Sequence, residues 1–178
     1  LGIRFVKGTA VVHNGRNVHI KKEDGTTEIC FGKNILIATG AKARRAEIPG
    51  MDLPGVMVSD ELLKTNEKQF ERMLILGGGV IGLEMATVFN GLGTEVTVIE
   101  TRERLMPKMD KEFSDALEEI LVERGIKVYK ASNLESISKE GCLKCVIDAG
   151  DHKDELEVDA VLVSVGRKPV TEGVFADD

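Results

Sequence analysis

The chain has 178 residues, of which 42% are hydrophobic and 30% are charged, and its formal net charge is −6. This size suits one folded domain, or one domain with part of another, and the acidic balance disfavours binding to nucleic acid or to a membrane surface. No apolar run approaches the ~18 residues that cross a membrane, and no signal peptide is evident. Three cysteines are too few for a disulfide scaffold, so we expect a reducing compartment, the cytoplasm or an organelle matrix.

The first 40 residues alternate in the manner of short strands with turns between them. Asn14-Gly15 lies between two such runs and predicts a hairpin, and residues 26–31 predict a further strand. The apolar run 34–39 predicts a strand that is buried on both faces. Residues 41–72 are expected to form a connector with a short helix, for which Ser59 is the expected N-cap.

The most informative segment covers residues 73–100. It predicts a buried strand, a glycine-rich turn that opens a helix, and a second strand that ends at Glu100. Gly77 permits the tight turn, Gly79 lets the backbone approach a pyrophosphate, and Gly82 lets the helix lie close to the strand. The helix N-terminus would hold the phosphates, and the Glu100 carboxylate would accept hydrogen bonds from the adenosine ribose. The segment therefore predicts a dinucleotide site inside one β-α-β unit.

The remaining elements complete an α/β domain. Asp110 is expected to open a helix over about 111–124, followed by a strand at 126–129 and by three short strands over 133–158. A last buried strand covers 160–165 and is broken at Gly166. We therefore expect a Rossmann-like domain with a parallel sheet, helices and a β-meander, accompanied by strands of a second, incomplete domain.

Charged residues near the glycine-rich turn indicate which dinucleotide is bound. A carboxylate at position 100 would repel the 2′-phosphate of NADP, so Glu100 favours NAD. Arg102 and Arg104 lie just beyond it and could bind a phosphate, although solvated loop charges are the simpler interpretation. Cys142 and Cys145 form a C-x₂-C pair, but on a strand their side chains would point to opposite faces, so we expect neither a redox pair nor a metal site.

Together these segments resemble the flavin-dependent pyridine-nucleotide–disulfide oxidoreductases. The resemblance rests on four segments in the family's order: Ile37–Ala41, the fingerprint Gly77–Glu84, Val96–Glu100, and Val163–Pro169. Within that family the chain is most similar to dihydrolipoamide dehydrogenases, through Gly32–Gly40, Ser59–Leu63 and Gly166–Thr171. The resemblance covers nearly the whole chain.

The resemblance implies a division into domains and a reaction. Residues 1–57 would be part of an FAD-binding domain, residues 58–165 an NAD-binding domain, and residues 166–178 the start of the return to the FAD domain. The implied reaction is the oxidation of dihydrolipoyl groups with NAD, through a redox disulfide and FAD. The implied partners are a nicotinamide dinucleotide and a lipoyl-bearing protein, and the parent enzyme is expected to be a homodimer.

The resemblance also implies which residues lie near the cofactors. The NAD site would include the fingerprint residues Gly77, Gly78, Gly79, Val80, Ile81 and Gly82. Glu84 and Gly166 match positions near the nicotinamide half, and Leu134 matches one beside the adenine. Gly8, Thr39, Gly40 and Ala41 match positions near the FAD adenosine. None of these residues is expected to be catalytic.

Several parts of the family pattern are missing from these 178 residues. They are the first dinucleotide fingerprint, the C-x₄-C redox pair, the later FAD-binding Asp motif and the dimerisation domain with its His-Glu pair. Together with the initial Leu1, this leads us to expect the central portion of such an enzyme, inactive alone and without retained FAD. The alternatives are a portion of an NADH oxidase, a coenzyme A disulfide reductase or a mercuric reductase, or a stand-alone NAD(H)-binding module.

Overall fold

The computed structural model describes residues 2–64 and 69–177, which form two compact units. Unit 1 consists of Leu1–Lys42 and Pro169–Asp178, and unit 2 consists of Ala43–Lys168. Unit 2 is therefore an insertion between the two stretches of unit 1. The units divide at other residues than the domains predicted at 1–57, 58–165 and 166–178, and the assignment of those domains to cofactors stays a prediction.

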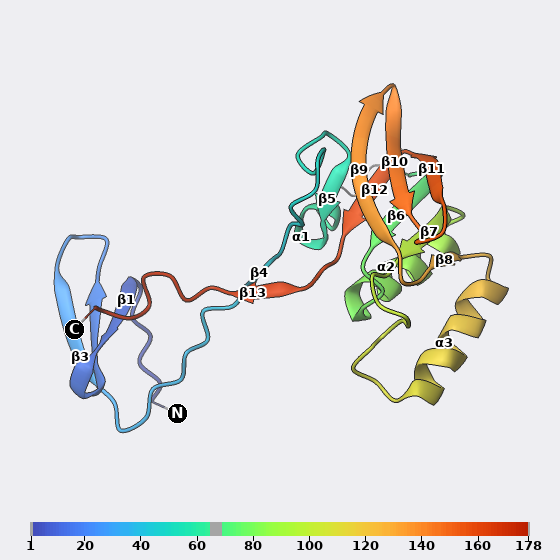
Figure 1. Ribbon diagram of the computed structural model, residues 1–178. Coiled ribbons are helices and arrows are strands. Elements are labelled where there is room, and N and C mark those ends of the chain that lie inside the picture. Colours follow the sequence, from blue (N-terminus) through green and yellow to red (C-terminus); the bar gives the residue numbers. More distant parts are fainter. Residues whose placement is uncertain (1, 65–68, 178) are drawn as a thin grey trace. The chain divides into compact units, whose positions relative to one another are not determined.

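Unit 1 is built on a three-stranded antiparallel sheet, drawn in blue in Figure 1. Its strands are β1 (Thr9–His13), β2 (Asn17–Lys21) and β3 (Thr27–Phe31), and the turn η1 (Asn14–Arg16) joins the first two. Gly15 adopts a φ of 74° in that turn, as the predicted hairpin requires. The C-terminal stretch lies along β1, because the Val12 N–H donates to the Val174 carbonyl and the Ala176 N–H to the Val12 carbonyl.

The strand predicted at residues 34–39 is wrong. The structure gives this run no regular secondary structure, and Leu36 is 90% exposed. Among the described residues of unit 1, Val174 alone is buried, so this unit offers no apolar layer against which the run could pack. An apolar sequence can form a buried strand only where neighbouring strands supply hydrogen-bond partners.

Unit 2 contains a five-stranded sheet in which every pair of neighbours is parallel. Its strands, in spatial order, are β5 (Val56–Val58), β12 (Ala160–Val163), β6 (Arg72–Leu76), β7 (Glu95–Ile99) and β8 (Lys127–Tyr129). Helix α2 (Val80–Gly91) connects β6 to β7, and α3 (Lys111–Glu123) connects β7 to β8. The predicted α/β class and its parallel sheet are confirmed.

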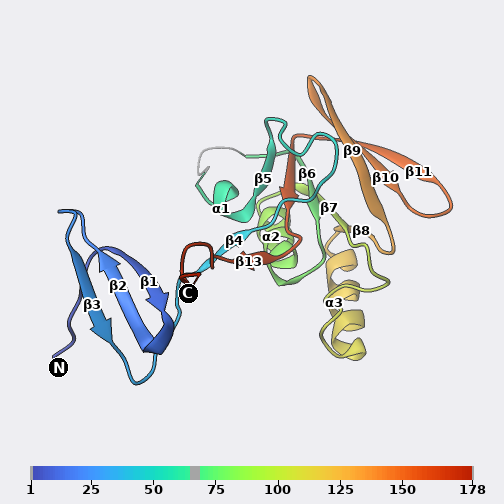
Figure 2. The ribbon, with the colours of Figure 1, turned by 60° about the vertical axis from the view of Figure 1, so that its left-hand side comes forward.

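Successive side chains of each strand point to opposite faces of this sheet, and each face packs against a different layer. Leu74 and Leu76 point into a cluster with the antiparallel sheet of β9 (Asn133–Glu140), β10 (Cys142–Asp148) and β11 (Lys153–Val158). Met73 and Ile75 point the other way, into a cluster with residues of α2 and α3. Figure 2 shows the meander and the two helices as separate ribbons around the sheet. Strands buried on both faces explain why these runs are almost wholly apolar.

Shorter elements complete the chain. The helix α1 (Ser59–Leu62) follows β5, and β4 (Ala41–Ala43) and β13 (Arg167–Pro169) lie where the chain passes between the units. Ser59 is the first helical residue and Val58 the N-cap, so the expected Ser59 cap is wrong. Val58 holds this place because its N–H donates to the Glu61 carboxylate at 3.0 Å. Among the described residues, no helix is long and apolar enough to cross a membrane.

Candidate functional site

A cleft of about 470 Å³ opens at the carboxyl ends of the parallel strands. From β6 the chain runs through β7 to β8 on one side, whereas β12 lies on the other side, so the strand order reverses at this point. Ligands of open α/β sheets bind at such a reversal. The cleft is lined by Leu76, Gly77, Gly79, Val80, Ile81, Ile99, Glu100, Thr101, Arg102, Met106, Pro107, Lys108, Met109, Ser164, Val165 and Gly166.

The three fingerprint glycines differ in what a side chain at their positions would meet. Gly77 has a φ of 112°, and a Cβ there would lie 2.5 Å from the Ser164 carbonyl oxygen. A Cβ at Gly82 would lie 2.1 Å from the Gly77 carbonyl oxygen, so this glycine lets α2 lie against the turn. At Gly79 a Cβ would meet nothing within 4 Å. The first two glycines are therefore needed by the fold, whereas the third borders the open cleft.

The N-terminus of α2 faces this open space. Gly79 is its N-cap, no side chain caps it, and its first turn holds no acidic residue. The first N–H groups of a helix have no partner within the helix, and they carry a partial positive charge. This end of α2, beside a glycine whose Cβ position is empty, therefore fits a phosphate or pyrophosphate group.

Glu100 holds together the loops that border the cleft. The residue is 8% exposed, its Oε2 accepts the Gly78 N–H at 2.9 Å, and its Oε1 accepts the Arg102 N–H at 2.9 Å. The Thr101 hydroxyl also lies 3.3 Å from Oε1. A carboxylate can accept about four hydrogen bonds, so capacity remains for a ligand hydroxyl. Glu100 thus connects the glycine turn to the loop after β7.

That loop, residues 101–110, supplies one wall of the cleft, which the sequence pattern did not reveal. The Met106 N–H donates to the Gly78 carbonyl at 2.9 Å, and Met106 adopts a φ of 46°. The fully buried side chain of Leu105 occupies the space beside Gly78, because a Cβ there would lie 2.5 Å from Leu105 Cδ2. Pro107, Lys108 and Met109 continue the wall. The only signal in the sequence is the apolar run Leu105–Pro107 inside a loop that is rich in charged residues.

The opposite wall follows β12. Ser164, Val165 and Gly166 line it, and Gly166 has a φ of 108° with open space where a Cβ would lie. The Gly166 carbonyl accepts the Arg44 N–H at 2.9 Å. The structure thus brings Gly166 to the same cleft as the fingerprint and Glu100.

Other predicted site residues of unit 2 lie elsewhere. Gly78 and Gly82 are buried behind the lining, where they shape the turn. Glu84 is exposed on the second turn of α2 and does not line the cleft. Leu134 is 3% exposed and belongs to the core cluster between β9–β11 and the parallel sheet. A role of Glu84 or Leu134 beside a cofactor stays a prediction.

The predicted residues of unit 1 hold its own loops together. The Thr39 hydroxyl donates to the Val170 carbonyl at 2.5 Å, and the Val170 N–H donates to the Gly40 carbonyl. Gly40 has a φ of 80°, and Ala41 begins β4. Gly8 precedes β1, where a Cβ would lie 2.7 Å from the Lys21 carbonyl oxygen. Contact of these four residues with FAD stays a prediction.

The cysteines of the C-x₂-C pair lie on β10, as expected for strand residues. Cys145 is fully buried and Cys142 only partly, which agrees with side chains on opposite faces. Burial raises the pKa of the Cys145 thiol to about 12, so it is not a nucleophile at neutral pH. In the part of the chain that the structure describes, no group of three or more His, Cys, Asp or Glu residues could hold a metal ion.

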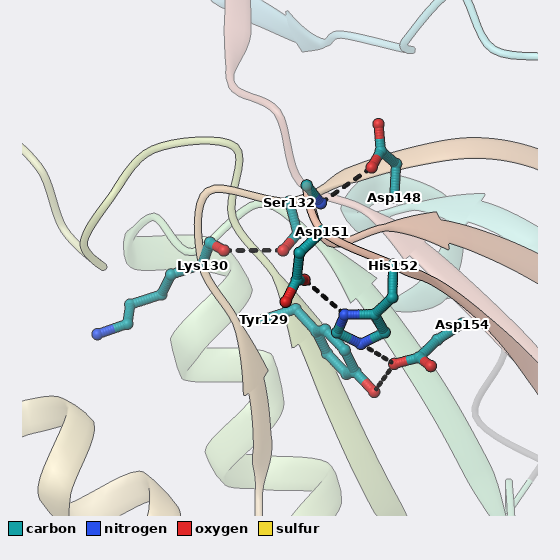
Figure 3. Close-up of polar contacts among 8 residues, drawn as sticks. Tyr129, Lys130, Ser132, Asp148, Asp151, His152 and Asp154 are labelled. Atoms are coloured by element: carbon teal, nitrogen blue, oxygen red, sulfur yellow. Dashed lines mark hydrogen bonds and ion pairs between the residues drawn. The ribbon is translucent and has the colours of Figure 1, made fainter.

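A polar cluster lies beside β8, at the turn between β10 and β11 (Figure 3). The Tyr129 hydroxyl donates to Asp154 at 2.9 Å, and the His152 ring lies between the carboxylates of Asp151 and Asp154. The Asp151 carboxylate, with Asp154, raises the pKa of His152. None of these side chains lines the cleft, so the cluster ties the meander to the sheet rather than serving the site.

Comparison with known proteins shows similarity over nearly the whole chain. The family described as "Pyridine nucleotide-disulphide oxidoreductase" matches residues 2–178. A dihydrolipoamide dehydrogenase of Chaetomium thermophilum is 35% identical over 97% of the chain and 35% of its own length. A mercuric reductase of Bacillus cereus is 33% identical over 95% of the chain and 26% of its length. An HOCl-induced flavoprotein disulfide reductase of Escherichia coli has 30% identity and a TM-score of 0.74, over 95% of this chain and 37% of that one. The chain therefore spans between 26% and 37% of the length of these relatives.

Proposed function

The chain belongs to the pyridine nucleotide-disulphide oxidoreductase family, whose members use FAD and NAD(P), and on this premise we propose that unit 2 binds NAD(H). One observation carries the proposal. The uncapped N-terminus of α2, the open space at Gly79 and the Glu100 carboxylate border one cleft at the reversal of strand order. The N–H groups of α2 would hold the pyrophosphate, and Glu100 would accept the ribose hydroxyls.

We further propose that the whole enzyme oxidises dihydrolipoyl groups, with a lipoyl-bearing protein as its partner and a homodimer as its working form. The similarity to the dihydrolipoamide dehydrogenase of Chaetomium thermophilum supports this substrate class. Bound flavin and nicotinamide rings supply hydride chemistry, and the chain's own residues bind and orient them. Gly8, Thr39, Gly40 and Ala41 of unit 1 would lie near the FAD adenosine.

A second candidate is a mercuric reductase, because such a relative is nearly as similar to the chain. An NADH oxidase, a coenzyme A disulfide reductase and a stand-alone NAD(H)-binding module are further alternatives. Cys142 and Cys145 lie on opposite faces of β10 and do not form a redox disulfide, so the dihydrolipoyl reaction would need a cysteine pair from elsewhere in the whole enzyme. We therefore expect no flavin absorbance and no lipoyl-dependent NADH formation from these residues alone, and measured formation would overturn this part of the proposal.

A comparison of the affinities of the chain for NADH and for NADPH tests the central proposal. Titration of the chain with each dinucleotide, followed by nicotinamide fluorescence, should show tighter binding of NADH. Replacement Glu100→Ala should lower the ratio of NADH to NADPH affinity by about tenfold, the equivalent of one hydrogen bond to a charged group. The ratio separates recognition from loss of fold, because unfolding weakens both dinucleotides equally. An unchanged ratio would count against ribose binding by Glu100, and no binding of either would reject the site.

A further inference from the structure

Gly166 forms one edge of the cleft, and its backbone is positioned by polar contacts with neighbouring residues. Its φ of 108° needs a glycine, and a Cβ there would meet nothing within 4 Å. Polar contacts act on this turn and on the residues beside it, and the Ser164 N–H donates to the Leu76 carbonyl at 2.8 Å. The Gly166 carbonyl accepts the Arg44 N–H at 2.9 Å, and the guanidinium of Arg167 reaches the Asp60 carboxylate at 3.1 Å.

The position of Asp60 is well fixed because several contacts hold the short helix α1, which carries it. The preceding strand β5 pairs in parallel with β12, and Val58 lies opposite Val163. The neighbouring Glu61 carboxylate accepts the Val58 N–H at 3.0 Å and two hydrogen bonds from Arg45 Nη2, at 2.9 and 2.7 Å. Arg45 Nη1 in turn donates to the Met51 carbonyl. The backbone at Asp60 is thereby fixed to the sheet edge.

The electrostatics agree with this contact. The Arg167 guanidinium is the largest influence that lowers the pKa of Asp60, and the Ala43 N–H lowers it further. Asp60 therefore faces both stretches where the chain enters and leaves unit 2, at residues 43–44 and 166–167. Side chains that are 36% and 49% exposed form a weak pair on their own. Its effect is on the position of a glycine turn that has open space where a Cβ would lie.

We propose that Asp60 is a positioning residue of the nucleotide cleft, which acts through Arg167 to hold the turn at Gly166 against the cofactor. The proposal rests on the proposed NAD(H) function. Asp60 does not line the cleft, so its effect on binding passes through the backbone of residues 164–167. No fingerprint, and no spacing in the sequence, links position 60 to position 167.

A double-mutant cycle on the 178-residue chain tests the coupling. Asp60→Asn and Arg167→Gln should each weaken NADH binding by about two- to fivefold, and the double variant should be no weaker than either single one. Asp60→Glu keeps the charge and should restore most of the affinity. Glu95→Gln is the matched control, because Glu95 pairs with Lys127 at 2.6 Å at the amino ends of β7 and β8, away from the cleft.

Hydrogen exchange gives a second readout that does not need the cofactor. Peptides that cover residues 164–167 should exchange faster in Asp60→Asn and Arg167→Gln than in the parent chain, but not in Glu95→Gln. Unchanged exchange at 164–167, or losses of affinity that multiply in the double variant, would overturn the role of Asp60. If the parent chain binds no NADH, the proposed function fails, and the exchange data alone decide the role of Asp60.

Discussion

The substitution Glu100→Gln tests how the cleft is held together. In the structure both carboxylate oxygens accept a backbone N–H, from Gly78 and from Arg102, each at 2.9 Å. A glutamine amide has one acceptor oxygen and one NH₂ group. Glutamine has the same shape as glutamate, but its NH₂ group must then lie against one of the two backbone N–H groups, and that N–H loses its acceptor.

The cost follows from burial. The bond to Gly78 is buried and the bond to Arg102 only partly, so the amide oxygen should turn toward Gly78 and leave the Arg102 N–H to solvent. An unpaired, largely buried polar group costs about 1–3 kcal/mol, and partial access to water places this case at about 1–2 kcal/mol. Glu100→Ala removes both acceptors and should cost about 3 kcal/mol.

Tyrosine fluorescence provides the assay. The chain has one tyrosine and no tryptophan, and Tyr129 lies in unit 2, where its carbonyl accepts the Glu100 N–H at 2.8 Å. Urea unfolding followed at this residue therefore reports on unit 2 alone. Glu95→Gln should change the unfolding free energy by less than about 0.5 kcal/mol, as surface substitutions do. Equal stability of Glu100→Gln and the parent chain would refute the reasoning.

Three further predictions concern other residues. Gly79→Ala should leave the urea midpoint of unit 2 unchanged but weaken NADH binding more than tenfold, whereas Gly82→Ala should lower the midpoint, because its Cβ would lie 2.1 Å from a carbonyl oxygen. An NMR titration should show a pKa above 6.5 for His152, and this pKa should fall in Asp154→Asn. Because the pKa is raised in the folded state, protonated His152 stabilises the fold fully below pH 6.5, and this stabilisation is lost as the pH rises through the folded-state pKa. Cys145, with its pKa of about 12, should resist alkylation at pH 8 until unit 2 is unfolded.

Each of these predictions has an outcome that contradicts it. Equal NADH affinity in Gly79→Ala would mean that the open space beside α2 is not the pyrophosphate site. A titration of His152 at or below 6.5 would mean that the carboxylates do not bond the ring in solution. Alkylation of Cys145 at the rate of Cys30 would show that the meander opens readily.

The fingerprint was predictable because its demands are local. Gly77, Gly82 and Glu100 are separated by spacings that one strand, one helix and one further strand impose, and the structure places all three at the turn beside the cleft. The wall at residues 101–110 was not predictable, because a loop has no periodicity. It is positioned by single bonds such as that from the Met106 N–H to the Gly78 carbonyl.

The incorrect strand at residues 34–39 has a different cause. Its apolar composition matches a buried strand, but pairing depends on neighbours that local sequence does not specify. Leu134 illustrates the same limit. Its strand was predicted, yet only the packing of the meander on the sheet decides that this side chain enters the core.

The insertion of unit 2 has a consequence for the order of folding. The two stretches of unit 1 are separated in sequence by all of residues 43–168, and closing a flexible loop of that length costs roughly 4 kcal/mol of chain entropy. Once unit 2 has folded, the bond from the Arg44 N–H to the Gly166 carbonyl holds its two ends together, and most of that cost is removed. The bonds of Val12 to Val174 and Ala176 can then form as local contacts. We therefore expect unit 2 to fold first, and unit 1 to lose protection first when the chain is denatured.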